Sequence, residues 1–110
     1  MARFTKGEVV TVPFPFSDGL STKVRPALIL HVLEKNELIL CKITSTKWND
    51  QYSVSLDSTD FQSKGLPKSS EIRTNHLWTA DSTIVLKSNG KLQKTKINEV
   101  IDKIIQLLRN

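Results

Sequence analysis

Along most of the chain, apolar residues either alternate with polar ones or cluster in short runs, which is the pattern of β-strands. The predicted strands are GEVVTVPFPF (7–16), RPALILHVL (25–33), ELILCKITST (37–46), QYSVSL (51–56), EIRTNHLWTA (71–80) and a short sixth, STIVLK (82–87). Loops or turns are predicted at SDGLSTK (17–23), EKN (34–36), FQSKGLPKSS (61–70) and SNG (88–90). In the first strand, the alternation places Val10 and Val12 on one face and Val9 and Thr11 on the other.

The C-terminal segment TKINEVIDKIIQLLRN (95–110) has a different period. Its apolar residues recur every three or four positions, which predicts an amphipathic α-helix. These residues are Ile97, Val100, Ile101, Ile104 and Leu108. Thr95 is the predicted N-cap because a threonine hydroxyl can accept a bond from a free N–H of the first turn. A run of strands followed by one helix indicates a mainly β fold with α, in which the helix packs on a small curled antiparallel sheet or barrel.

Length and composition indicate one ordinary soluble domain over residues 1–110, since 38% of the residues are hydrophobic and 25% are charged. No apolar run is long enough to span a membrane, and the N-terminus lacks the apolar core of a signal peptide, so we expect the cytoplasm. Cys41 is the single cysteine, which excludes an internal disulfide and disfavours a cysteine-based metal site. The formal net charge of +5 weakly favours a polyanionic partner.

Arg25 lies directly before a proline, at the start of an apolar strand. Proline lacks an N–H and biases the preceding residue toward extended backbone, so it suits the start of a strand. If the EKN turn closes a hairpin with a two- or four-residue loop, Arg25 faces Thr46, with Thr44 one pleat along on the same side. A three-residue loop would bring Ser45 or Lys47 opposite instead. Either register gathers a guanidinium, hydroxyls and an ammonium group at one end of the hairpin.

This group of side chains has the chemistry of a phosphate site. The guanidinium fork of arginine can donate two N–H bonds to phosphate oxygens. The hydroxyls of ITST can donate further bonds, or position an attacking oxygen. The alternative is structural: Arg25 pairs with Asp18 or Glu34, and the threonines are ordinary edge-strand residues.

Four segments, in order along almost the whole chain, resemble the MazF/PemK (Kid-like) family of bacterial toxin–antitoxin toxins. The first, GEVVTVPFPFSDGLSTKVRPALIL, is similar to the opening strand, loop and Arg-Pro motif of that family. CKITST resembles its apolar-ITS element, SSEIRTNHLWTAD its arginine-containing strand, and GKL…INEVIDKIIQLL its Gly-Lys-Leu turn and terminal helix. Each motif alone has low to moderate specificity, but four in order are strong support.

The resemblance implies a small SH3-like antiparallel β-barrel with a C-terminal helix, assembled as a homodimer. It implies a sequence-specific endoribonuclease that cleaves single-stranded RNA without a metal or other cofactor, leaving a 2′,3′-cyclic phosphate and a 5′-hydroxyl end. It also implies a cognate antitoxin protein that covers the active site. DNA would be contacted only indirectly, through the antitoxin.

The resemblance also assigns roles to residues. The arginine of the Arg-Pro motif matches Arg25, the threonine of the ITS element matches Thr44, and Arg73 lies in the fifth-strand segment; these three are the predicted catalytic residues. In Kid-like members an aspartate two residues after that last arginine acts with it as acid and base, but here the position is Asn75, an amide that cannot be a general base. The base is therefore unassigned, with His76 a weak candidate. The predicted RNA-binding residues are Phe16, Lys23, Ser45, Thr46, Lys47 and Asn75.

Aromatic residues near these segments could stack on the bases of a single strand, which is a sequence-tolerant way of holding RNA. The candidates are Phe14, Phe16, Trp78 and Trp48, which lies just past ITST. Core packing is favoured for Phe14 and is the alternative for Phe16 and Trp48. Contact with an antitoxin is a third interpretation for Trp48.

Two other functions stay open at this point. A non-catalytic, gyrase-poisoning toxin of the CcdB type shares the barrel but needs no phosphate-binding Arg/Thr pair. An inactive SH3-like binding module would explain the missing aspartate.

Overall fold

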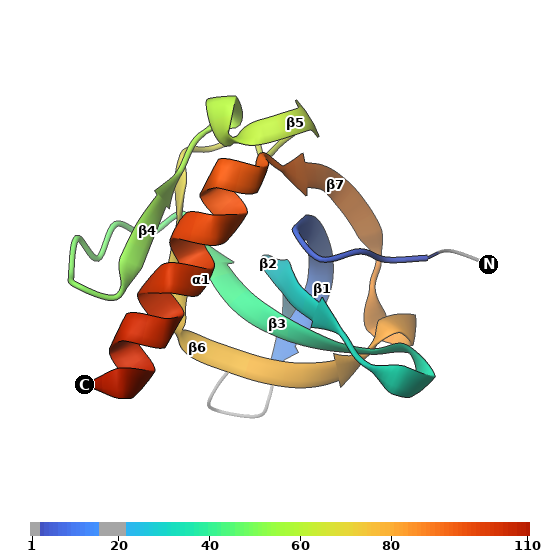
Figure 1. Ribbon diagram of the computed structural model, residues 1–110. Coiled ribbons are helices and arrows are strands. Elements are labelled where there is room, and N and C mark those ends of the chain that lie inside the picture. Colours follow the sequence, from blue (N-terminus) through green and yellow to red (C-terminus); the bar gives the residue numbers. More distant parts are fainter. Residues whose placement is uncertain (1–2, 16–21) are drawn as a thin grey trace.

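The chain forms a curled antiparallel sheet with an α-helix packed across one face (Figure 1). The computed structural model describes residues 3–15 and 22–110, and within them the sheet has seven strands. The elements are β1 (Glu8–Pro15), β2 (Thr22–Val32), β3 (Glu37–Thr44), β4 (Ser53–Leu56), β5 (Phe61–Lys64), β6 (Ser70–Asp81), β7 (Lys87–Leu92) and α1 (Lys94–Arg109). Neighbouring strands follow the order β4-β6-β3-β2-β1-β7-β5. The predicted mainly β fold with a C-terminal helix is confirmed.

Each face of the sheet carries its own apolar cluster, as the alternation in the sequence predicts. Helix α1 covers one face and buries Ile97, Val100 and Ile104 against strand residues that include Val9, Leu28, Cys41, Ile43 and Ile72. The opposite face buries Val10, Val12, Ala27, Ile29, Leu38 and Leu40. None of the described helices is long and apolar enough to cross a bilayer.

Three segments, predicted as a short strand, a turn and a loop, differ in the structure. Ser82–Ile84, in the predicted sixth strand, is a 3-10 helix, and the strand β7 begins only at Lys87. The predicted turn SNG lies inside β7, where a side chain at Gly90 would collide with the carbonyl oxygen of Ser63. The glycine therefore permits the close approach of β5, which was predicted as loop. The pairing of β5 with β7 could not be foreseen because β5 buries only Phe61.

The helix begins before the predicted N-cap. Thr95 lies within α1, and the N-cap is Gln93, which makes no side-chain capping bond. Its backbone N–H donates to the carbonyl oxygen of Asp60, which ties the helix start to the chain before β5. The buried Lys96 adds a second tie, since its Nζ donates to the carbonyl oxygen of Ser55 at 2.9 Å and lies 3.8 Å from the carboxylate of Asp60. Tertiary contacts thus override the local capping preference.

The register of the β2–β3 hairpin also differs from the prediction. Ala27 is opposite Lys42 and Ile29 opposite Leu40, with a register shift before His31. The turn contains a 3-10 helix and the shift adds an unpaired residue, so the predicted pairing of Arg25 with Thr46 is wrong. The register near the Arg25 end is displaced by two residues, and a displacement of two leaves every side chain on its predicted face.

Cys41 is enclosed in the core beside α1. Its thiol donates a hydrogen bond to the carbonyl oxygen of Arg73 at 3.1 Å, and burial raises the pKa of the thiol to about 12. The thiolate is the reactive form, so at pH 8 the native protein should react with a thiol reagent roughly a thousandfold more slowly than after unfolding in denaturant. Stoichiometric labelling of the native protein at the rate of a free cysteine would contradict this burial.

Candidate functional site

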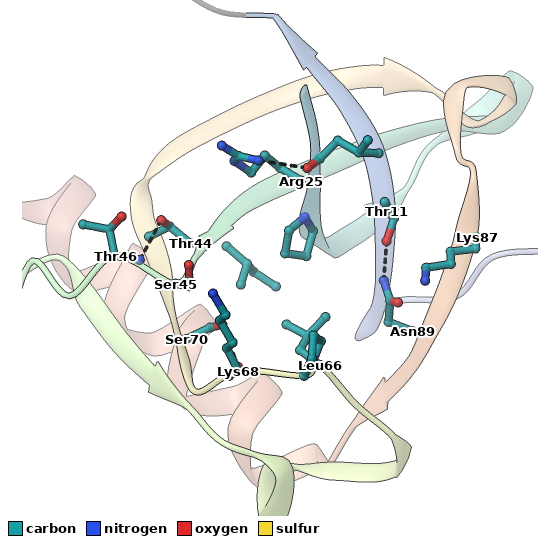
Figure 2. A pocket seen from close by; sticks show the side chains of 14 residues that line it. Thr11, Arg25, Thr44, Ser45, Thr46, Leu66, Lys68, Ser70, Lys87 and Asn89 are labelled. Carbon is teal, nitrogen blue, oxygen red and sulfur yellow. Dashed lines mark hydrogen bonds between the residues drawn. The ribbon is translucent and has the colours of Figure 1, made fainter. Parts of the chain in front are cut away.

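A pocket of about 410 Å³ opens at one end of the sheet (Figure 2). It is lined by Thr11, Val24, Arg25, Pro26, Ile43, Thr44, Ser45, Thr46, Leu66, Pro67, Lys68, Ser70, Lys87 and Asn89. Among these described lining residues there are three cationic side chains, several hydroxyls and an amide, but no carboxylate. A concave surface of this composition attracts anions, because the charges share one sign and the low-dielectric walls focus the field.

Arg25 and Thr44 lie at the rim of the pocket, on the side formed by β2 and β3 (Figure 2). The guanidinium Nη1 of Arg25 donates to the carbonyl oxygen of Val24 at 3.1 Å. The backbone N–H of Thr46 donates to the Thr44 hydroxyl at 3.1 Å. Because that hydroxyl accepts from the backbone, its own proton can be donated to a ligand oxygen.

The opposite wall comes from β1, β7 and the segment before β6. Asn89 is buried, and its amide nitrogen donates to the hydroxyl of Thr11 at 2.7 Å, which fixes the orientation of the amide. Lys87 and Lys68 complete this side. Sequence reasoning missed Thr11, Lys68, Lys87 and Asn89 as site residues. Their signal is weak, since Lys68 lies in a predicted loop and Asn89 in a predicted turn.

Behind the rim, the carboxylate of Glu71 holds the loop between β3 and β4. Its two oxygens accept the backbone N–H groups of Trp48 at 3.0 Å and of Asn49 at 3.4 Å. Burial alone would raise the pKa of Glu71, but bonds from Trp48, Ser53 and Asn49 and the charge of Lys47 lower it below its ordinary value. The carboxylate therefore stays ionised, and its hold on the loop is lost only as the pH falls through this lowered pKa.

Arg73 is bound into the same loop. Its Nη1 donates to the carboxylate of Asp50 at 2.8 Å and to the hydroxyl of Ser53 at 2.6 Å, and its guanidinium lies 4.7 Å from the centre of the Trp48 ring. The bond from Arg73 is the main cause that lowers the pKa of Asp50. Arg73 is buried and does not line the pocket.

The structure brings some of the predicted site residues together and separates others. Those that meet at the pocket are Arg25, Thr44, Ser45 and Thr46. Those described outside it are Lys23 and Asn75, which are exposed on their strands, and Lys47 and Arg73, which bind neighbouring protein groups. Phe16 lies outside the described residues.

His76 lies away from the pocket, on the face of the sheet opposite α1. Its ring packs against Phe14 at 5.3 Å and Trp78 at 5.7 Å between centroids. Burial, followed by the charges of Lys42 and Arg73, lowers the pKa of His76, so the ring is neutral near pH 7. It does not face the hydroxyls of the rim as a base would.

Comparison with known proteins places the chain among toxins. The profile of the family described as "PemK-like, MazF-like toxin of type II toxin-antitoxin system" matches residues 5–108. A search of curated proteins finds no match.

Solved structures support the same fold. The crystal structure of MazF (Form-I) from Deinococcus radiodurans is 20% identical, with a TM-score of 0.79 over 100% of both chains. The MazE-MazF complex (Form-III) from the same organism is 20% identical, with a TM-score of 0.76 over 96% of this chain and 95% of that one. An endoribonuclease in complex with its cognate antitoxin, from a mycobacterial species, is 14% identical, with a TM-score of 0.74 over 97% and 96%. At such identities the likeness establishes the fold.

Proposed function

The chain belongs to the PemK-like, MazF-like family of toxins of type II toxin–antitoxin systems, and from this premise we propose that it is an endoribonuclease that cleaves single-stranded RNA. The observation that carries the proposal is the pocket, in which Arg25 and the Thr44 hydroxyl share a rim with two lysines nearby. An RNA phosphate is an anion that guanidinium and hydroxyl groups bind well. The endoribonuclease names of similar structures support the assignment.

The proposed reaction uses a nucleophile that belongs to the substrate. The 2′-oxygen forms a bond to the adjacent phosphorus while the bond from phosphorus to the 5′-oxygen breaks. The 2′-hydroxyl loses its proton and the leaving 5′-oxygen takes one up, which gives a 2′,3′-cyclic phosphate and a 5′-hydroxyl. No metal is needed to generate this nucleophile, and the site's contribution is to hold the 2′-oxygen in line with the leaving group.

Arg25 and Thr44 have separate roles in this mechanism. Negative charge builds on the nonbridging oxygens as phosphorus becomes pentacoordinate, and the guanidinium of Arg25 stabilises it. The hydroxyl of Thr44, already oriented by the N–H of Thr46, donates to one of those oxygens or to the attacking one. Ser45 is a second donor at the same rim. We further propose that the protein acts as a homodimer and that its regulator is an antitoxin protein, as the complexes of similar toxins suggest.

Incubation of the purified protein with a mixed-sequence single-stranded RNA in EDTA tests this function. We expect discrete fragments whose 5′ ends accept phosphate from polynucleotide kinase without prior dephosphorylation. Intact RNA at protein concentrations in excess of the substrate would refute the proposal. Inhibition of gyrase without RNA cleavage would select the CcdB-type alternative, and harmless overexpression would select a binding module.

A further inference from the structure

Trp48 is a large aromatic side chain on the surface beside the pocket. It is 59% exposed, although the guanidinium of Arg73 lies against its ring at 4.7 Å. A cation on one face of an indole stabilises the ring by cation–π attraction. Since one face is covered and most of the residue is exposed, the ring presents aromatic surface to solvent.

Two contacts restrain Trp48, one to its ring and one to its backbone. Arg73 is itself fixed by Asp50 and Ser53, so its guanidinium forms a rigid support below the ring. The backbone N–H of Trp48 is bound to the carboxylate of Glu71. A side chain positioned in this way loses little conformational entropy when a ligand stacks on it, which favours binding.

The register of the sheet places the backbone of Trp48 near the rim of the pocket. Glu71, which holds the Trp48 backbone, lies directly opposite Thr44 on the neighbouring strand. Trp48 is two residues beyond Thr46, so at most about 7 Å of extended chain separates it from the rim of the pocket. A nucleotide next to the one held in the pocket would lie within reach of the ring.

The charges around the ring favour a nucleic acid. Lys47 precedes Trp48, and its Nζ is anchored by the hydroxyl of Ser69 at 2.8 Å. Arg73 lies beneath the ring, and Lys68 lines the adjacent pocket. The two carboxylates of the loop region are engaged, Asp50 with Arg73 and Glu71 with backbone N–H groups.

We propose that Trp48 is a stacking platform for a nucleobase of the single-stranded RNA, next to the nucleotide whose phosphate occupies the pocket; the inference rests on the proposed function. Arg73 and Glu71 are positioning residues that act through Trp48 and its loop. Because every base has an aromatic face, the platform contributes affinity with little sequence preference, and each stacked base is worth about a 5- to 150-fold change in binding.

Steady-state cleavage by Trp48→Ala, Trp48→Phe and Leu108→Ala tests the platform. Trp48→Ala should raise KM at least about fivefold and leave kcat within about twofold, because ground-state and transition-state binding are lost together. Trp48→Phe should recover most of the loss, and Leu108→Ala, at a 73% exposed apolar residue, should match the wild type. An unchanged KM in Trp48→Ala with cleavage intact would overturn the platform but leave the nuclease assignment standing.

The role of Arg73 is tested by a double-mutant cycle. As a positioning residue, Arg73→Gln should raise KM like Trp48→Ala, and the double variant should resemble Trp48→Ala alone. A fall in kcat at unchanged KM would instead show that Arg73 takes part in the chemistry, and would overturn its positioning role.

A binding measurement keeps the two proposals distinguishable. In a Trp78→Phe background, Trp48 is the remaining tryptophan, so its fluorescence reports on the platform. An uncleavable oligonucleotide with 2′-deoxy sugars should quench this emission at concentrations near KM. Quenching by a protein that does not cleave RNA would retain the platform and refute the nuclease. No quenching by a protein that cleaves RNA would show that the ring does not stack on the strand, and would overturn the platform.

Discussion

Replacing Arg25 with alanine should slow RNA cleavage by about 100- to 1000-fold, the effect of removing one donor that stabilises transition-state charge, or about 2.7–4 kcal/mol. The guanidinium lies at the rim of a pocket that has three cations and no carboxylate among its described lining residues. The loss should fall mainly on kcat, because the charge that Arg25 stabilises grows as the 2′-oxygen attacks. The measurement is single-turnover cleavage of a short RNA at saturating protein.

The control for this variant is Arg109→Ala, which removes the same charge from the exposed last turn of α1 and should cleave like the wild type. Arg25→Lys separates charge from geometry. Lysine keeps the charge but not the planar fork, so it should restore only part of the rate. Cleavage by Arg25→Ala at the wild-type rate would remove the guanidinium from the mechanism, while the family membership would stand.

Replacing Leu28 with alanine should lower the free energy of unfolding by about 2 to 5 kcal/mol. Leu28 lies on β2 and is fully buried in the apolar cluster beneath α1. Deleting its methyl groups therefore leaves a cavity. A domain of this size has about 5–15 kcal/mol of stability, and each kcal/mol lost lowers Tm by about 4–8 °C. Urea unfolding followed by circular dichroism measures the change.

Leu108→Ala is the matched control, because it makes the same chemical change at a residue that is 73% exposed near the end of α1. Its effect should stay within about 0.5 kcal/mol. Equal destabilisation by the two variants would contradict the core described here. Unlike Arg25→Ala, Leu28→Ala should reduce cleavage only in proportion to the protein that unfolds.

Arg25 and Thr44 line one pocket, as predicted, although the register from which this was predicted is wrong. The predicted hairpin placed Arg25 opposite Thr46, but the observed pairs Ala27–Lys42 and Ile29–Leu40 displace that register by two residues. Side chains alternate along a strand with a period of two, so this error changed neighbours without changing faces. A displacement by one would have moved the two side chains to opposite faces.

Arg73 shows the opposite case, in which a residue's surroundings could not be predicted from its motif. Its segment resembles one that carries a catalytic arginine, and the sequence contains nothing that links it to the loop after β3. In the structure, its guanidinium joins Asp50, 23 positions earlier, and supports the ring of Trp48. The pairing of β4 with β6, in which Ser53 lies opposite Arg73, brings these groups together, and no local pattern specifies that pairing.

By itself, the sequence determined the strands of the central sheet, the terminal helix, the two buried faces and the family, because periodicity and motifs depend on residues close together along the chain. The tertiary structure alone decided the pairing of β5 with β7, the start of α1 and the far wall of the pocket. Asn89, for example, is oriented by Thr11, 78 positions away. Such contacts form between residues far apart in the sequence and depend on how the strands pack. The local sequence does not specify which distant residues will meet.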